Sequence, residues 1–169
     1  DLEVLKRDLS YGKRLNLNQV RFWTSPWQFW ADGQKYIDNL VAIVRTCYEC
    51  SYGVMPIIWN GNGLDIGFLE PSFWEEKADA YTIAIVNALK DEPGLFMWDV
   101  MNEPGCNPWI EKAPAEERQA RLDKIYAFVK HKCELVKKLD PVNAITVGHT
   151  VAEEIGPCYD YVDVVSFHD

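Results

Sequence analysis

The spacing of apolar residues alternates between two periods along this chain, and no other feature of the sequence constrains the fold as strongly. Longer segments with apolar residues at helical spacing predict helices over residues 1–15, 34–50, 75–90 and 115–139. Between and after them, short runs rich in β-branched and aromatic residues predict strands over residues 18–23, 54–59, 95–103, 144–147 and 163–167. Strands alternating with helices predict an α/β fold with a parallel sheet, ordered as in the chain, and a ligand site at the carboxyl ends of its strands.

The third predicted strand ends in polar residues. Apolar residues run directly into Asn102 and Glu103, and Pro104 then ends the strand. A carboxylate at such a strand end, beside an amide that donates to hydroxyl groups, suits proton transfer onto a leaving oxygen. An Asn-Glu-Pro tripeptide also occurs in ordinary polar turns. The residues at the other strand ends are therefore needed to choose between a catalytic site and an ordinary turn.

The other predicted strands also end in polar and aromatic side chains. These residues are Arg21, Trp23, Trp59, Asn60, His149 and His168. In a parallel fold they converge on one face of the sheet. Strict alternation directs Arg21 and Asp99 inward, where an ion pair that only shapes the core is an alternative to a role at the site.

On these residues the chain resembles clan A glycoside hydrolases, most closely the cellulase-type catalytic domains of glycoside hydrolase family 5. The resemblance is carried by Arg21, by WDVMNEP over residues 98–104 and by VVSFH over residues 164–168. It implies a (β/α)8 TIM barrel, of which the chain covers roughly the first helix to the sixth strand. Family 5 enzymes usually carry a histidine near the end of the strand that corresponds to residues 54–59, where this sequence has Trp59 and Asn60.

The resemblance also implies a chemistry, which is retaining hydrolysis of a β-linked glycoside. Glu103 would protonate the leaving oxygen and then deprotonate water, and Asn102 would hydrogen-bond the sugar 2-hydroxyl. The nucleophile would be a glutamate on a seventh strand outside this chain, and no metal or organic cofactor is implied. The other residues expected to contact substrate are Arg21, His168, Trp59, Trp23 and His149.

The amino-acid composition limits the kinds of molecule that this chain can bind. The chain has 169 residues, a net charge of -9 and a pI of about 4.8, which argue against nucleic acid because phosphates require basic patches. No run approaches the ~18 apolar residues of a membrane span. Aromatic residues make up 13% of the chain and include seven Trp, whose flat rings suit a carbohydrate partner.

Five cysteines leave at least one unpaired. Cys47 and Cys50 form a C-x-x-C, but without a second such pair or a nearby His we favour ordinary thiols over a zinc site. The chain opens at Asp1 without a signal peptide. Localisation is therefore unknown from the residues, and only the resemblance favours a secreted or periplasmic protein.

Two segments are predicted to be loops. Residues 24–33 carry Trp27, Phe29 and Trp30, of which one ring is expected on the sugar cleft, and residues 64–73 carry Asp65 and Glu70. Neither segment has the regular apolar spacing of the predicted helices and strands.

A complete eight-stranded barrel takes ~250 residues, so residues 1–169 are interpreted as one partial barrel domain. Its sheet would have two open edges, which favour self-association. Two alternatives stay open, a non-catalytic carbohydrate-binding remnant and another α/β hydrolase. The latter would use metal-bound water at His149, His168 and Asp169, but no H-x-H or H-E-x-x-H spacing supports it.

Overall fold

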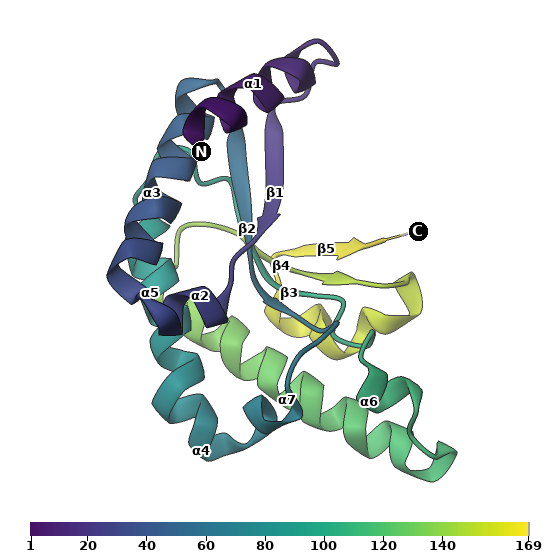
Figure 1. Cartoon of the computed structure of the whole chain (residues 1–169). Coiled ribbons are helices and arrows are strands. Elements are labelled where there is room, and N and C mark those ends of the chain that lie inside the picture. The colour runs from purple at the N-terminus through teal and green to yellow at the C-terminus, as the bar shows by residue number, and fades with distance from the viewer. Residues whose placement is uncertain (169) are drawn as a thin grey trace.

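The computed structural model describes residues 1–168 and has one parallel sheet of five strands, in the order β1-β2-β3-β4-β5 (Figure 1). The predicted strands, their parallel pairing and their order are confirmed. The strands are β1 (Gln19–Trp23), β2 (Gly53–Asn60), β3 (Trp98–Asn102), β4 (Ile145–His149) and β5 (Val164–Phe167).

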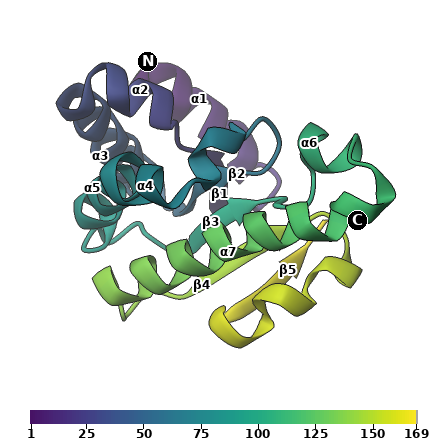
Figure 2. The ribbon, with the colours of Figure 1, turned by 90° about the horizontal axis from the view of Figure 1, so that it is seen from below.

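Three of the longer helices, α3 (Gly33–Glu49), α5 (Asp79–Leu89) and α7 (Ala115–Leu139), connect the successive strands from β1 to β4 and lie on one side of the sheet (Figures 1 and 2). Helix α3 packs on β2, and α7 crosses β3 and β4. The helices are α1 (Leu2–Lys13), α2 (Pro26–Ala31), α3 (Gly33–Glu49), α4 (Pro71–Phe73), α5 (Asp79–Leu89), α6 (Pro108–Glu111) and α7 (Ala115–Leu139). Polar side chains near the carboxyl ends of the strands contact one another across the sheet.

Local chemistry explains where several helices begin. The side chain of Asp1 caps α1 by accepting a hydrogen bond from the amide of Glu3, and Asp32 caps α3 by accepting from the amide of Lys35. Helix α3 ends just before Ser51, which takes a φ of 61° and turns the chain into β2. These caps satisfy amide groups that a helix start leaves without a partner.

Two segments predicted as loops contain helices. Residues 24–33 include α2, because Ser25 accepts from the amide of Gln28 and Pro26 occupies the first helical turn. Residues 64–73 contain a 3-10 helix (Ile66–Leu69) and α4, and a π-helical turn (Trp74–Ala78) then leads into α5. The loop prediction was wrong there because Ser25, Asp65 and the prolines act as helix starts.

The third strand begins later than predicted. Residues 95–97 lie outside β3, and Leu95 forms only an isolated bridge with Val54. The turn after α5 delays regular pairing until Trp98, whose amide donates to the carbonyl of Ala144 on the approach to β4 (2.9 Å).

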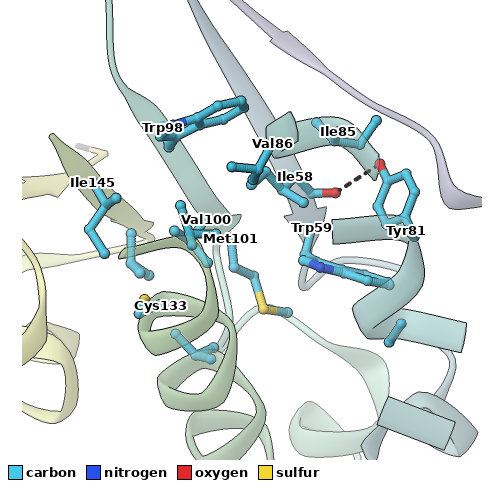
Figure 3. Close-up of a cluster of buried hydrophobic side chains, with 14 of the residues drawn as sticks. Ile58, Trp59, Tyr81, Ile85, Val86, Trp98, Val100, Met101, Cys133 and Ile145 are labelled. Carbon is cyan, nitrogen blue, oxygen red and sulfur yellow. Dashed lines mark hydrogen bonds between the residues drawn. The ribbon is translucent and has the colours of Figure 1, made fainter. Parts of the chain in front are cut away.

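The core lies between the sheet and the helices, and Figure 3 shows its central part. Two consecutive residues on β2, Ile58 and Trp59, and two on β3, Val100 and Met101, all enter this core. Strict alternation is broken on both strands, and β3 has a register irregularity between Asp99 and Asn102. As a consequence Asn60 and Asn102 project away from the helix layer.

All five cysteines are free, so the interpretation as ordinary thiols is consistent with the structure. Burial raises the pKa of the Cys47 thiol to about 11, which makes it a poor nucleophile near neutral pH. Within residues 1–168, no helix combines the length and the apolar composition needed to cross a membrane.

Candidate active site

Glu103 lies directly after β3 in a backbone conformation that is rare for a residue other than glycine, with φ 48°. Its amide donates to the carbonyl of Gly148 on β4 (2.6 Å), which continues the parallel pairing by one residue. The side chain is 25% exposed, and its Oε1 lies 2.8 Å from Nδ1 of His168 at the end of β5. The structure therefore brings together two predicted site residues that are 65 positions apart.

Arg21 joins the predicted set through Asp99 and Asn102. Its Nε and Nη2 atoms donate to Oδ2 of Asp99 (3.0 and 2.6 Å), and Nη2 also donates to Oδ1 of Asn102 (2.5 Å). The ion pair between Arg21 and Asp99, which the sequence left open as an alternative to a role at the site, is present in the structure. The arginine reaches the site by holding the Asn102 amide, and both of its acceptors lie on β3.

The electrostatics of this ion pair are set by burial. Asp99 is 1% exposed, and burial raises the pKa of its carboxyl group, while the charge and hydrogen bonds of Arg21 oppose that rise. The amide of Gly148 also donates to Asp99 (3.3 Å). Both oxygens of the carboxylate therefore accept hydrogen bonds, Oδ2 from Arg21 and Oδ1 from the amide of Gly148.

Asn60 fixes the other end of the Asn102 amide. Nδ2 of Asn102 donates to Oδ1 of Asn60 (2.9 Å), and Nδ2 of Asn60 donates to the carbonyl of Asn62 (2.7 Å). A flipped Asn102 amide would place two acceptors against each other at Asn60 and two donors against each other at Arg21. One side-chain N–H of Asn102 is therefore used in the hydrogen bond to Asn60. The second N–H has a fixed direction, because Asn60 and Arg21 hold the amide in one orientation.

Two glycines make room for this arrangement. A Cβ at Gly148 would lie 2.9 Å from Nη2 of Arg21, 3.1 Å from Oδ2 of Asp99 and 3.3 Å from Nε2 of His168. A Cβ at Gly61 would overlap the carbonyl oxygen of Glu103. The absence of side chains at these positions lets strand ends from the whole sheet approach one another.

Trp23 is at the predicted strand end and is 62% exposed. Trp59 and His149 are placed differently from the expectation, because they are only 3% and 1% exposed. The Trp59 ring packs edge-on against Tyr81 and Phe128, and its Nε1 donates to the Thr82 hydroxyl (3.1 Å; Figure 3 shows the packing against Tyr81). Sequence alternation missed this because β2 sends Ile58 and Trp59 to the same side.

His149 faces α7, where its ring stacks on Tyr126 with ring centroids 6.3 Å apart. Its Nδ1 is buried and has no hydrogen-bond partner among the described residues. Burial and the nearby charge of His168 lower the pKa of His149 to about 4. The residue therefore has the environment of a neutral core histidine, with its ring packed against α7.

No cluster of three or more His, Cys, Asp or Glu able to hold a metal occurs within residues 1–168. Asp169, which the metal alternative required, lies outside the described residues. The structural roles of Asn60 and Gly148 were not found from the sequence, although the Asn-Gly-Asn-Gly run at residues 60–63 marked the end of β2 as unusual.

The fold matches part of the TIM barrel found in glycoside hydrolases, as comparison with solved structures shows. A β-mannanase from the blue mussel Mytilus edulis superposes with a TM-score of 0.64 at 21% identity, covering 87% of this chain and 51% of that protein. A GH5_18 variant from Streptomyces cattleya, solved with Manb1-4GlcNAc, gives a TM-score of 0.66 at 14% identity, covering 88% of this chain and 40% of that protein.

A curated sequence relative is the mannan endo-1,4-beta-mannosidase F of Aspergillus clavatus. It is 33% identical over 69 residues, which is 41% of this chain and 13% of the relative. No protein-family model matches the chain. The predicted resemblance to clan A and family 5 glycoside hydrolases is confirmed, and the chain spans about half the length of the mussel enzyme and less of the other two proteins.

Proposed function

We propose that this chain is the acid/base-bearing part of a retaining glycoside hydrolase that acts on β-linked mannan. The observation that carries the proposal is the Glu103 carboxyl group, which lies beside His168 at one edge of the sheet and next to an Asn102 amide of fixed orientation. Its supporting argument is chemical, since hydrolysis of a glycosidic bond needs a proton donor at the leaving oxygen.

In the proposed reaction Glu103 gives its proton to the glycosidic oxygen and later removes one from water. His168 shares a hydrogen bond with Oε1, which leaves Oε2 to act on the substrate. The positive φ of Glu103 turns its side chain out of the regular strand. Partial exposure of the Glu103 side chain leaves it accessible to a sugar and to the attacking water.

Asn102 binds the 2-hydroxyl of the sugar that undergoes substitution. That contact strengthens as positive charge develops at the anomeric centre, so it favours the transition state over the bound substrate. Arg21 and Asn60 each contact the amide directly and hold it in one orientation. Preorganisation of this kind avoids an energetic cost at the moment of reaction.

The nucleophile is proposed to come from outside residues 1–169. Two nearby carboxylates within the chain have other partners, because Asp99 holds Arg21 and Glu154 accepts from the amide of Thr150 (3.2 Å). Mannan is favoured as substrate by the names of the Aspergillus and mussel proteins, which are a mannan endo-1,4-beta-mannosidase and a beta-mannanase.

The test is the variant Glu103→Gln in a protein that carries this chain together with the remaining barrel strands. The near-isosteric amide keeps the packing and cannot donate a proton. We expect hydrolysis of mannan to fall by about 10²- to 10⁴-fold and hydrolysis of an aryl β-mannoside with a good leaving group to fall much less, because that bond breaks without acid assistance.

The matched control is Glu111→Gln, at a carboxylate on α6 that carries no step of the proposed reaction. Equal losses on both substrates for Glu103→Gln would contradict the acid assignment. Binding of mannan without any hydrolysis by the extended protein would instead identify a carbohydrate-binding remnant.

A further inference from the structure

The end of β2 carries the dipeptide Asn-Gly twice in succession. Asn60-Gly61 closes the strand, and Asn62-Gly63 follows directly. No other Asn in the sequence is followed by Gly. This dipeptide is chemically labile, because the backbone nitrogen of a residue without a side chain reaches the side-chain carbonyl carbon of the preceding Asn with little steric hindrance. The surroundings of each pair in the fold then determine whether the reaction takes place.

The second pair, Asn62-Gly63, is exposed and loosely held. The amide of Leu64 donates to the carbonyl of Gly61 (3.1 Å), which closes a β-turn with Asn62 and Gly63 at its centre. Within residues 1–168, neither the amide of Gly63 nor the side chain of Asn62 forms a hydrogen bond. Gly63 has a φ of 80°, and nothing lies within 4 Å of a carbon added to it. The two groups that would react are therefore unhindered.

The first pair, Asn60-Gly61, has the opposite surroundings. The amide of Gly61 donates to the carbonyl of Asn102 (2.7 Å). The Asn60 side chain donates to the carbonyl of Asn62 (2.7 Å) and accepts from Nδ2 of Asn102 (2.9 Å). Gly61 is also buried against the carbonyl group of Glu103. Three hydrogen bonds must therefore break before the Gly61 nitrogen reaches the Asn60 side chain.

We propose that Asn62-Gly63 is a site of spontaneous deamidation and that the fold protects Asn60-Gly61 from the same reaction. The Gly63 nitrogen loses its proton to solvent and forms a bond to Cγ of Asn62. The bond between Cγ and Nδ2 breaks, and Nδ2 takes a proton from solvent and leaves as ammonia. Water then opens either C–N bond of the resulting cyclic imide, which gives aspartate or isoaspartate at residue 62.

The isoaspartate product changes a contact of the candidate active site. In that product the chain continues through Cγ, and the former backbone carbonyl group of residue 62 becomes a free carboxylate. This carbonyl oxygen is the acceptor for Nδ2 of Asn60, and Asn60 in turn orients the Asn102 amide. Deamidation therefore places a negative charge at the Asn60 side chain. The inference does not depend on the proposed function, because Glu103 takes no part in the reaction.

The test uses the 169-residue chain as it is, incubated in mildly alkaline buffer and sampled over time. Digestion at acid pH and peptide mass spectrometry locate the deamidated residue, and an isoaspartyl methyltransferase with a labelled methyl donor measures isoaspartate. Each hydrogen bond at Asn60-Gly61 is worth about fivefold, so residue 60 should react about 10²-fold more slowly than residue 62. In denaturant the two residues should react at similar rates, because the contacts that distinguish them are absent.

Three variants complete the experiment. Asn62→Gln keeps the amide on a longer side chain and should stop the reaction at residue 62. Gly63→Ala places a methyl group beside the attacking nitrogen and should slow it. The matched control is Asn87→Gln, at an exposed position on α5 that precedes Ala88, which should leave deamidation of residue 62 unchanged. Side-chain N–H signals of Asn60 in NMR spectra should shift as isoaspartate accumulates, and should stay constant in Asn62→Gln.

The inference is overturned if residue 62 keeps its amide in the native chain, or if residue 60 reacts as fast as residue 62. Labelled methyl groups in the peptide around residue 62 of Asn62→Gln would overturn it as well. None of these outcomes bears on proton donation by Glu103, so failure here is distinct from failure of the proposed function.

Discussion

Asn60 on β2 and Asn102 on β3 are joined by a directed amide hydrogen bond, in which Nδ2 of Asn102 donates to Oδ1 of Asn60 over 2.9 Å. Because Arg21 occupies the other end of the Asn102 amide, Asn60 completes its orientation. A family 5 enzyme usually has a histidine near the end of this strand. The Asn60–Asn102 pair differs from that pattern, and its physical role is to orient the Asn102 amide.

Because of the Asn60–Asn102 hydrogen bond, we predict that two substitutions of Asn60 lower kcat/KM by different amounts. Asn60→Asp keeps an acceptor for Asn102, whereas Asn60→Leu removes it at similar size. In a protein carrying this chain with the remaining strands, Asn60→Leu should lower kcat/KM by about tenfold, the value of one neutral hydrogen bond, and Asn60→Asp should lose less.

The control for this prediction is a 2-deoxy glycoside, which lacks the hydroxyl that Asn102 is proposed to bind. The effect of Asn60→Leu should shrink on that substrate. A loss of the same size on both substrates would show that Asn60 acts on folding or on another contact.

Gly148 is predicted to be intolerant of a side chain. Gly148→Ala places a methyl group between Arg21, Asp99 and His168, so the ion pair must shift. We expect a loss of about 1–3 kcal/mol in the free energy of unfolding, as for other overpacked sites, measured by urea denaturation. Gly156→Ala is the matched control, since nothing lies within 4 Å of its added carbon; similar losses would contradict the steric argument.

We predict that His149 lowers the free energy of unfolding of the protein at acid pH. Its pKa is lowered from 6.5 to about 4 in the folded chain, so the unfolded state binds the proton more readily. The stabilising contribution is fully present above pH 6.5 and is lost as the pH falls toward about 4, amounting to about 3 kcal/mol.

The measurement for His149 is the free energy of unfolding across that pH range for the native chain and for His149→Phe, which preserves an aromatic ring against Tyr126. The variant should lose less stability on acidification. Parallel curves would mean that the ring is not buried in its neutral form.

Strand β5 is predicted to promote self-association of the isolated chain. Among residues 1–168 it pairs only with β4, and Val164, Val165 and Phe167 are 42%, 44% and 50% exposed. An open apolar edge is a template for pairing with another copy. Sedimentation should show a mass that rises with concentration, and Val165→Lys should suppress the rise. Val142→Lys, at an 86% exposed loop position, should not.

The isolated chain should not hydrolyse glycosides by double displacement. A single carboxylate donates a proton from one side and cannot also attack the opposite face of the ring. The measurement is aryl β-mannoside hydrolysis by the purified chain beside Glu103→Ala. Robust turnover that depends on Glu103 would show that a second carboxylate acts within the chain, with Glu70 the first to examine.

The sequence by itself determined the order and type of the main elements, because apolar spacing reports which face of each segment is buried. Helix α7 occupies the predicted residues, and the five parallel strands follow the predicted order. The sequence also located Asn102, Glu103, Arg21 and His168 at strand ends, since a polar residue directly after an apolar run is visible without a structure. Short helices such as α2 were missed because they depend on single capping residues.

Only the tertiary structure decided how these side chains face. Ile58 and Trp59 enter the core together, as do Val100 and Met101, and this paired irregularity buries Trp59 while bringing Asn102 to Arg21. It cannot be predicted from period-two alternation, because a local irregularity of this kind changes which face of the sheet the following side chains occupy. The burial of His149 against α7 has the same origin, since packing between distant segments, and not local spacing, selects the face.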